Sequence, residues 1–205
     1  QIQSDNIIKI LNARTVENGY AFFMTEEIAG GDLDNIIQSP FLSLKLAIDI
    51  TRGILNGVGD MHKNGNRLLH RDLKPANILV DKKNNPLIAD FGSVKKIPDG
   101  EEFVNGSRHA VLYCPPESYH NEYDKKSDLY QVGIVLYQLL GGYLPYDGVS
   151  YLKSSELKKH KALTSQYDKS KFIESILEKK VKKGKLIDLD TLPPYVDSRI
   201  MKIIK

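Results

Sequence analysis

"HRDLKPANILV", at residues 70–80, decides the interpretation of this chain, together with "ADFG" at 89–92. The first stretch places His, Arg, Asp and Lys within five positions and then continues, through a Pro and an Asn, into an apolar run. A structural loop gains nothing from so many charges beside a buried strand, because burying a charge is costly. The order instead indicates a backbone that holds several charged groups around one small, highly charged ligand.

The residue types in these stretches suit the chemistry of phosphate groups. Phosphoryl transfer depends on positioned charges and a held metal more than on covalent catalysis. Asp72 can accept the proton of an attacking hydroxyl, and Lys74 can reach a phosphate from the same side of the backbone. Asn77 and Asp90 offer oxygen atoms of the hard type that Mg²⁺ prefers. Each residue alone is more often a surface residue, but their spacing favours a phosphate-transfer site.

Composition places the chain among ordinary globular proteins. It has 205 residues, of which 41% are hydrophobic and 27% charged, enough for one large domain or two small ones. A net charge of +3 gives no reason to expect a nucleic-acid partner. The single cysteine rules out a disulfide within the chain, and the most apolar run, 132–144, is too short to cross a bilayer. We therefore expect a cytoplasmic protein with neither a membrane nor a nucleic-acid partner.

Charge is uneven along the chain. Between Lys153 and Lys185 there are eleven lysines and four acidic residues, so this segment carries about +7 and the remainder about −4. A solvated helical face is the commoner explanation of such a segment. The alternative is a docking surface for an acidic partner.

The pattern of apolar residues predicts one hairpin followed by a mainly helical region. Two β-prone runs, 7–11 and 20–25, flank an Asn-Gly pair, which is a strong hairpin signal. Ser43 is a good N-cap for the apolar three-and-four spacing that follows it. Further expected elements are a helix over 32–38, strands over 77–80 and 86–90, a loop-rich segment over 92–126, a buried helix over 127–140 capped by Ser127 or Asp128, and helical spacing over 171–181.

Three motifs occur together in the chain. "HRDLKPAN", "DFG" (90–92) and "PPE" (115–117) resemble those of the eukaryotic-type protein kinases, whose loop pattern is H-R-D-x-K-x-x-N. Residues 20–33 resemble the fifth strand, hinge and following helix of that family, and 127–146 resemble the long buried helix of its large lobe. "DNIIKIL", at residues 5–11, is similar to the entry to the fourth strand, so the resemblance covers about residues 5–146.

The resemblance implies an α+β, protein-kinase-like fold with a mainly helical C-terminal lobe and a short β-hairpin remnant of the N-terminal lobe. Residues 1–28 would form the partial small lobe and hinge, and 29–205 the large lobe. A Lys-rich insertion is expected around 150–185, and the large lobe is expected to be truncated at its C-terminus.

The resemblance also implies roles for individual residues in the transfer of the γ-phosphate of ATP to a protein hydroxyl. Asp72 would be the catalytic base, Lys74 would contact the transferred phosphate, and Asn77 and Asp90 would hold Mg²⁺. Lys74 within "DLKPAN" is similar to the serine/threonine branch of the family.

On the nucleotide side, the resemblance makes Thr25 a gatekeeper. Glu26 and Ile28 would present hinge backbone groups to the adenine. Asp32 would lie near the ribose, and Leu79 would form the floor beneath the base.

Supporting roles are expected around this set. Arg71 would pair with a phosphorylated activation loop, in which Ser107 and, less readily, Ser93 are the candidate sites. His70 is expected to act as a hydrogen-bonding strut, and Asp128 to cap or brace backbone groups without touching substrate. Phe91 is expected to be a core contact that positions Asp90, and the Cys114 thiol to be buried and inert.

The chain also departs from the family pattern. It contains neither a Gly-rich phosphate loop nor the strand that carries the paired lysine, and Ala110 stands where serine/threonine members usually have Thr. The main prediction is a serine/threonine protein kinase domain, with a protein as substrate. The alternative is a pseudokinase or scaffold that uses the lobe as an interaction surface. A small-molecule phosphotransferase is disfavoured, because such enzymes often carry H-G-D in place of H-R-D.

Overall fold

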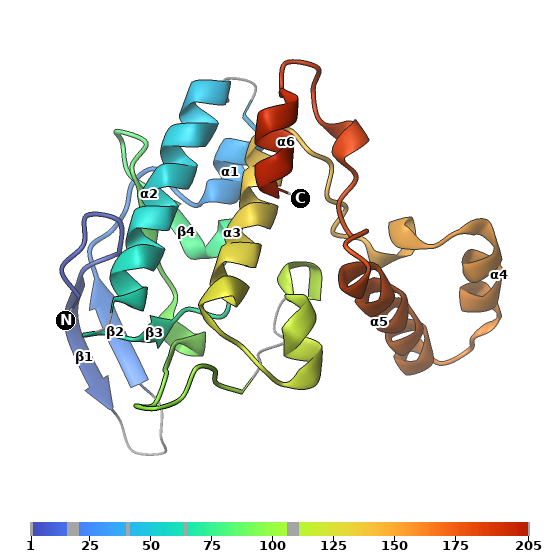
Figure 1. Ribbon diagram of the computed structural model, residues 1–205, viewed down its shortest axis with the longest axis horizontal. Coiled ribbons are helices and arrows are strands. Elements are labelled where there is room, and N and C mark those ends of the chain that lie inside the picture. Colours follow the sequence, from blue (N-terminus) through green and yellow to red (C-terminus); the bar gives the residue numbers. More distant parts are fainter. Residues whose placement is uncertain (1, 16–20, 40–41, 64, 106–110, 205) are drawn as a thin grey trace.

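The computed structural model describes residues 2–15, 21–39, 42–63, 65–105 and 111–204 (Figure 1). A small β-hairpin lies at one end of the molecule, and helices α1, α2, α3 and α6 form the central body. Helices α4 and α5 project at the opposite end. The fold is α+β, with a mainly helical body and short antiparallel strand pairs, as the sequence predicts.

The predicted hairpin is present. Strand β1 (Ile10–Thr15) pairs antiparallel with β2 (Ala21–Thr25), with an irregularity near its start. The first strand begins three residues later than expected, because Ile7 and Ile8 are buried against the helical body, where the Ile8 amide donates to the Ile88 carbonyl at 2.9 Å. The Asn-Gly pair expected in the turn lies outside the described residues.

Two helices follow as predicted. Helix α1 (Leu33–Ile37) is capped by Asp32, whose carboxylate accepts from the Asn35 amide. Helix α2 (Leu44–His62) is capped by the Ser43 hydroxyl. The apolar stripe of α2 packs against α3 and β5, and it is this burial that stabilises the helix most.

The segment between α2 and α3 contains short antiparallel strand pairs. The predicted strands are β4 (Ile78–Val80) and β5 (Pro86–Ile88), which pair antiparallel in register, and β3 (Leu68–Leu69) pairs with β6 (Lys95–Lys96). The described parts of the segment 92–126, which are residues 92–105 and 111–126, are loop-rich as expected. Single turns of 3-10 helix occur at Pro75–Asn77, Phe91–Ser93, Val111–Tyr113, Pro116–His120, Gly148–Tyr151 and Leu189–Thr191.

Helix α3 (Lys125–Leu139) is the central buried helix, but its predicted cap is wrong. Asp124, rather than Ser127 or Asp128, is the N-cap, and its carboxylate accepts from the Lys126 and Ser127 amides. The Ser127 hydroxyl accepts from the Asp124 amide in return, so two amide donors at the helix start are satisfied reciprocally. This arrangement leaves the Asp128 carboxylate available for the site described below.

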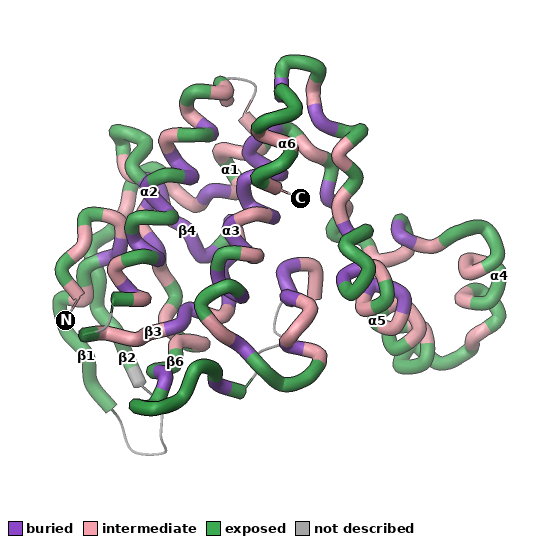
Figure 2. Tube along the Cα trace, in the orientation of Figure 1, coloured by how far each residue is buried: buried purple, intermediate pink, exposed green. Residues whose placement is uncertain are grey.

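The C-terminal third consists of α4 (Ser154–Ala162), α5 (Gln166–Lys182) and α6 (Ser198–Ile204). The helical spacing over 171–181 is confirmed as part of α5, whereas α4 was not predicted. No residue of α4 is buried, and α5 buries Ile176, Leu177 and Val181 (Figure 2). None of the helices within the described residues is long and apolar enough to cross a membrane.

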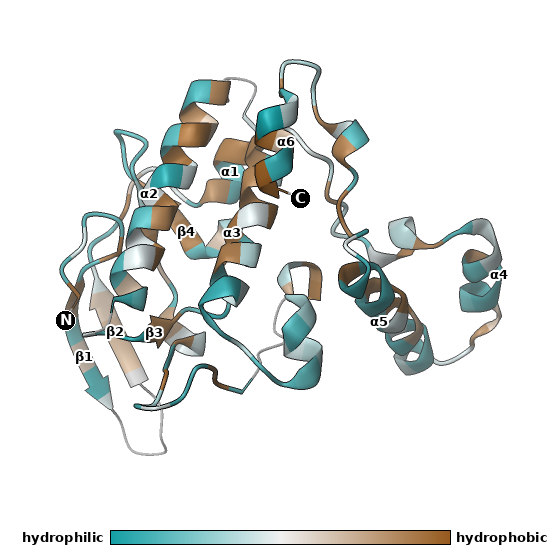
Figure 3. Cartoon of the chain, in the orientation of Figure 1, coloured by the Kyte–Doolittle hydropathy of each residue, from teal (hydrophilic) through white to brown (hydrophobic). Residues whose placement is uncertain are grey.

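The hydrophobic core lies between α2, α3 and the β4–β5 pair. Figure 3 shows hydrophobic residues on α3 beyond its hydrophilic first turn, a largely hydrophilic α4, and residues of both kinds on α5. Fully buried side chains from this layer include Ile50, Ile54, Ile78, Ile88 and Val135. The elements that carry the motif residues therefore lie directly against this close-packed core.

Candidate active site

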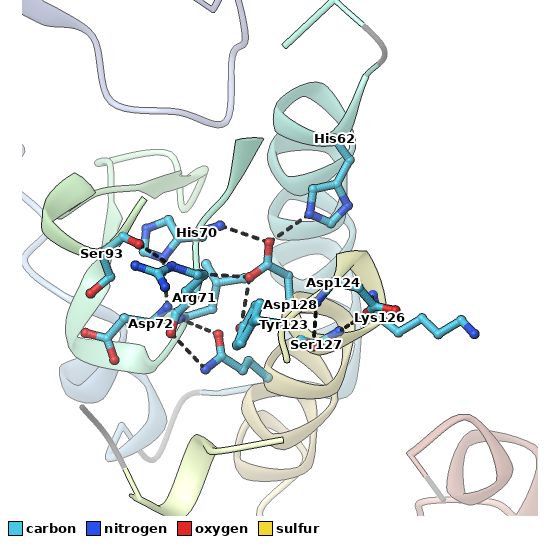
Figure 4. Close-up of polar contacts among 12 residues, drawn as sticks. His62, His70, Arg71, Asp72, Ser93, Tyr123, Asp124, Lys126, Ser127 and Asp128 are labelled. Atoms are coloured by element: carbon cyan, nitrogen blue, oxygen red, sulfur yellow. Dashed lines mark hydrogen bonds and ion pairs between the residues drawn. The ribbon is translucent and has the colours of Figure 1, made fainter. Parts of the chain in front are cut away.

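The loop that carries the HRD motif is fixed by one buried carboxylate, that of Asp128 on α3 (Figure 4). Its two oxygens accept from the backbone amides of His70, at 3.0 Å, and Arg71, at 2.9 Å. The His62 Nε2 lies 2.8 Å from Oδ2, and the Tyr123 hydroxyl donates to Oδ1 at 3.1 Å. A buried carboxylate is tolerated only when it is hydrogen-bonded in this way. Asp128 thus braces the loop backbone, as expected.

His70 connects the loop to the following strand. Its Nε2 lies 3.0 Å from the Ala89 carbonyl, and its side chain is buried. Burial lowers the pKa of His70 below its ordinary value, although the nearby Asp128 carboxylate opposes this effect. A neutral ring that donates to Ala89 is the hydrogen-bonding strut expected from the sequence.

Gln131 on α3 is a supporting residue that the sequence reasoning missed. Its Oε1 accepts from the Leu73 amide at 2.8 Å, and its Nε2 donates to the Tyr113 carbonyl at 3.1 Å. Gln131 thereby connects the HRD loop to the segment before the PPE motif. The available signal was its position three residues after Asp128, which places both on one face of α3.

Three of the predicted catalytic residues meet at a single carboxylate. The Asp72 Oδ2 accepts from the Lys74 Nζ at 2.9 Å and from the Asn77 Nδ2 at 3.0 Å. Asn77 also donates to the Asp72 carbonyl at 2.8 Å, because the turn Pro75–Asn77 folds it back toward the loop. Asp72 and Asn77 are both buried, which limits the geometries available to them.

Asp90 reaches the same region through the neighbouring strand. The Ala89 amide donates to the Asn77 carbonyl at 2.9 Å, so Asp90 directly follows a residue that is paired with Asn77. Asp90 is exposed and has a left-handed backbone with φ of 58°, stabilised by a 3.1 Å bond from the Gly92 amide to its Oδ1. Such strained residues concentrate at functional sites. Phe91 is half-buried and packs against the core, as predicted.

The donor atoms at Asn77 and Asp90 fit a hard divalent cation. The Asn77 amide nitrogen faces Asp72, so its carbonyl oxygen is the atom left for a metal. Only one oxygen of the exposed Asp90 carboxylate accepts from Gly92. Neutral and charged oxygens of this kind, few in number, suit Mg²⁺ that also takes phosphate oxygens and water.

The predicted nucleotide-side residues lie on the connection between β2 and α1. Asp32 pairs through its backbone with Leu79, so these two predicted residues are brought together. The connection passes very close to β4, since a Cβ at Gly30 would lie 2.1 Å from the Val80 carbonyl oxygen.

Three more predicted residues precede this close approach. Thr25 ends β2, Glu26 is exposed and Ile28 is half-exposed. Within the described part of the chain, none of these three side chains makes a hydrogen bond to the HRD loop.

Arg71 bridges two parts of the segment after the DFG motif. Its Nε donates to the Ser93 carbonyl and its Nη1 to the Asn105 carbonyl, both at 2.7 Å. Burial lowers the pKa of Arg71 from its ordinary value. Ser107 and Ala110 lie outside the described residues.

Two further residues near the PPE motif are held by side-chain contacts. The Cys114 thiol is buried, as expected, and its Sγ lies 2.8 Å from the Ser118 Oγ. Glu117 accepts a hydrogen bond from the Ser127 hydroxyl, which connects the motif to the start of α3.

Comparison with known proteins identifies the family. The model of the protein kinase domain matches residues 1–189 of the chain. The chain belongs to the protein kinase family. This kinase chain is 33% identical over 162 residues to the serine/threonine-protein kinase pkn3 of Myxococcus xanthus, an alignment that covers 73% of the chain and 29% of that protein.

A second group of relatives comes from Plasmodium. The calcium-dependent protein kinase 4 of Plasmodium berghei and that of Plasmodium falciparum are each 34% identical to the chain over 137 residues, which is 64% of the chain and 25% of each relative. The kinase chain therefore spans less than a third of the length of the curated relatives it matches.

Proposed function

We propose that the protein is a serine/threonine protein kinase that transfers the γ-phosphate of ATP to a hydroxyl of a protein substrate. The observation that carries this proposal is the arrangement of the Lys74 ammonium, at 2.9 Å, and the Asn77 amide, at 3.0 Å, around one oxygen of Asp72. Such a group joins a proton acceptor to a cation and a metal-binding amide, which is what phosphoryl transfer requires.

Each residue has a distinct part in the proposed mechanism. Asp72 orients the substrate hydroxyl and accepts its proton, for which its second oxygen is suited, since Lys74 and Asn77 both bind Oδ2. Lys74 moves from Asp72 to the transferred phosphate when the substrates bind. Asn77 and Asp90 hold Mg²⁺. Bound Mg²⁺ neutralises charge on the phosphates of ATP.

The nucleotide-side assignment follows from the connection between β2 and α1. The backbone of Glu26 and Ile28 is proposed to bind the adenine, with Thr25 as gatekeeper. Asp32 is proposed to lie by the ribose and Leu79 beneath the base, which their backbone pairing supports.

Three further proposals concern the compartment, a partner and the division of the chain into lobes. The single cysteine supports a reducing compartment such as the cytoplasm. The exposed lysines of α4 support an acidic partner for the 153–185 segment, within the proposed insertion of 150–185. Residues 1–28 are proposed to be part of a small lobe and 29–205 to belong to the large lobe.

A scaffold without kinase activity is the second candidate, and Ala110 is the feature that favours it. The deciding experiment supplies the full-length protein with γ-labelled Mg-ATP and a generic basic protein, and identifies the labelled residues. We expect label on serine and threonine, and none with Asp90→Ala. The matched control is Asp99→Ala, which removes a highly exposed carboxylate and should retain full transfer. A folded wild-type protein that transfers no phosphate would support the scaffold.

A further inference from the structure

Helix α1, which Asp32 caps, is too short to be stable without contacts from the rest of the molecule. It has five residues, whereas isolated helices shorter than about 12 residues are marginal in water. Leu33 is buried, Ile36 and Ile37 are partly buried against the core, and the backbone of Asp32 pairs with Leu79 on β4. The direction in which Asp32 presents its carboxylate therefore depends on how α1 is held.

The two oxygens of the Asp32 carboxylate have different surroundings. Its Oδ1 accepts from the Asn35 amide at 3.2 Å and from the Asn35 Nδ2 at 2.9 Å. Both bonds fall on the same oxygen, so Oδ2 is the atom left for a ribose hydroxyl. Because Oδ1 is bound to the first turn of α1, a rotation of that turn also moves Oδ2.

A hydrogen bond from a distant loop fixes this turn. The Tyr146 hydroxyl donates to the Asp34 Oδ1 at 2.9 Å, across 112 positions of sequence. Asp34 lies in the first turn of α1, two positions after Asp32. A hydrogen bond to an ionised carboxylate is about twice as strong as one between neutral groups. The loop after α3 thus gives α1 a polar attachment in addition to its packing on the core.

The charge of Asp34 sets the direction of the hydrogen bonds behind Tyr146. An ionised carboxylate can only accept, so the Tyr146 hydroxyl donates to it. The Gln138 Nε2 therefore donates to the Tyr146 oxygen, at 3.2 Å. The Gln138 Oε1 then accepts from the buried Tyr113 hydroxyl at 2.7 Å. The series has one direction, from Tyr113 to Asp34, which favours a single arrangement of its side chains.

The same series reaches the HRD loop through α3. Gln131, about two turns before Gln138 on this helix, donates to the Tyr113 carbonyl and accepts from the Leu73 amide. Tyr113 is therefore held at its backbone by one glutamine and at its hydroxyl by the other. Helix α1 and the loop of the proposed catalytic base are thus connected to the same helix.

We propose that Tyr146 is a positioning residue for the nucleotide: by holding Asp34 it fixes the first turn of α1, and with it the Asp32 oxygen that accepts from the ribose. The proposal rests on the proposed kinase function and adds a residue that acts through α1. Without the Tyr146 bond, α1 keeps its core packing but its first turn can rotate. A ribose hydroxyl must then order Asp32 on binding, which weakens its contribution to affinity.

The test measures the binding of Mg-ATP, and of Mg-dideoxy-ATP that lacks both ribose hydroxyls, to the full-length protein. We expect wild type to bind ATP about tenfold more tightly than dideoxy-ATP, the effect of one hydrogen bond to a charged group. Tyr146→Phe keeps the ring and removes the hydroxyl. It should weaken ATP binding about fivefold, leave dideoxy-ATP binding and the kcat at saturating ATP within about twofold, and so reduce the preference to about twofold.

Substitutions at the partner and at a neighbouring tyrosine make the test specific. Asp34→Ala should match Tyr146→Phe, and the double variant should bind ATP no more weakly than either single variant. Asp34→Asn keeps an accepting oxygen and should retain most of the preference for ATP. Tyr143→Phe, at an exposed tyrosine of the same loop, is the matched control and should change neither Kd.

The outcomes separate this proposal from the kinase function. Equal Kd values of wild type for the two nucleotides, or an unchanged preference for ATP in Tyr146→Phe, would overturn the role of Tyr146, whether or not phosphate is transferred. An equal loss of affinity for both nucleotides in Tyr146→Phe would also overturn it, because general damage to the site has that effect. A wild-type protein that shows the expected preference and the expected loss in Tyr146→Phe, but transfers no phosphate, would support the positioning role and overturn the kinase function.

Discussion

The HRD loop and helix α4 are attached to the molecule in opposite ways. The loop is joined to α3 by hydrogen bonds that its backbone amides donate to the side chains of Asp128 and Gln131. Helix α4 has no buried residue and only a half-buried face, which includes Leu157 and His160, against α5. Both carry many charges, but only the loop holds its charged groups at fixed positions.

The difference shows which charges can do chemistry. A group that orients a reacting atom must be fixed by packing and hydrogen bonds, and it is expensive to bury unless every polar atom is satisfied. Exposed lysines such as Lys158 and Lys159 can attract a partner but cannot define a geometry. The two regions should therefore respond differently to substitution.

The largest expected effect is at Asp128. Asp128→Ala removes four hydrogen bonds from a fully buried position and leaves the His70 and Arg71 amides unsatisfied. We expect a loss of about 3–5 kcal/mol in the free energy of unfolding. Lys159→Ala, on exposed α4, should change it by less than about 0.5 kcal/mol. Urea titrations of both variants check this, and equal losses would remove the distinction between the two regions.

An intermediate effect on the free energy of unfolding is expected at Gly148, where the turn Gly148–Tyr151 packs against α5. Gly148→Ala places a methyl group against Ile173 and should cost about 1–3 kcal/mol in the free energy of unfolding. Gly133→Ala is the matched control, because a Cβ at this α3 position meets nothing within 4 Å. It should stabilise the helix by about 0.5–1 kcal/mol. Thermal unfolding measures both, and a neutral Gly148→Ala would show that α5 is not tightly packed there.

The smallest effect is a pH dependence that distinguishes the buried site from the surface. Because the pKa of His70 is lowered in the folded protein, the unfolded chain binds more protons and stability falls as the pH drops below about 6.5. The contribution of one such group is at most about 1.4 kcal/mol per pH unit. His70→Gln should reduce the pH dependence of the free energy of unfolding between about pH 6.5 and 5. His120→Gln, at an exposed residue, should leave that pH dependence unchanged. An unchanged slope in His70→Gln would contradict the assignment of a buried neutral ring.

Local signals in the sequence predicted most of the fold. Apolar spacing and the Ser43 cap located α2, and the Asn-Gly pair located the hairpin. The predicted cap of α3 was wrong because Asp124 and Ser127 form reciprocal hydrogen bonds. Both residue types are common N-caps, so the sequence alone did not show which of them begins the helix. Helix α4 was missed because its SSELKKHKA sequence has too few apolar residues to show a period.

The candidate site was predictable only in part, and for a physical reason. The groups gathered at Asp72 lie within five residues of it, so their spacing carries the information. The Gln131 contacts span 58 positions to Leu73, and the Tyr146–Asp34 contact spans 112. Contacts of that kind exist only after the helices have packed. The spacing of Asp128 and Gln131 places both on one face of α3, but it does not identify their partners.

Single-turnover phosphate transfer by Asp72→Asn tests the central claim most directly. The amide keeps the shape of the carboxylate but cannot accept the substrate proton, so we expect the rate to fall by about 10²–10⁴-fold while the Kd for Mg-ATP stays within about threefold of wild type. Asp99→Asn should leave both quantities unchanged. A transfer rate in Asp72→Asn equal to that of wild type would contradict the role assigned to Asp72.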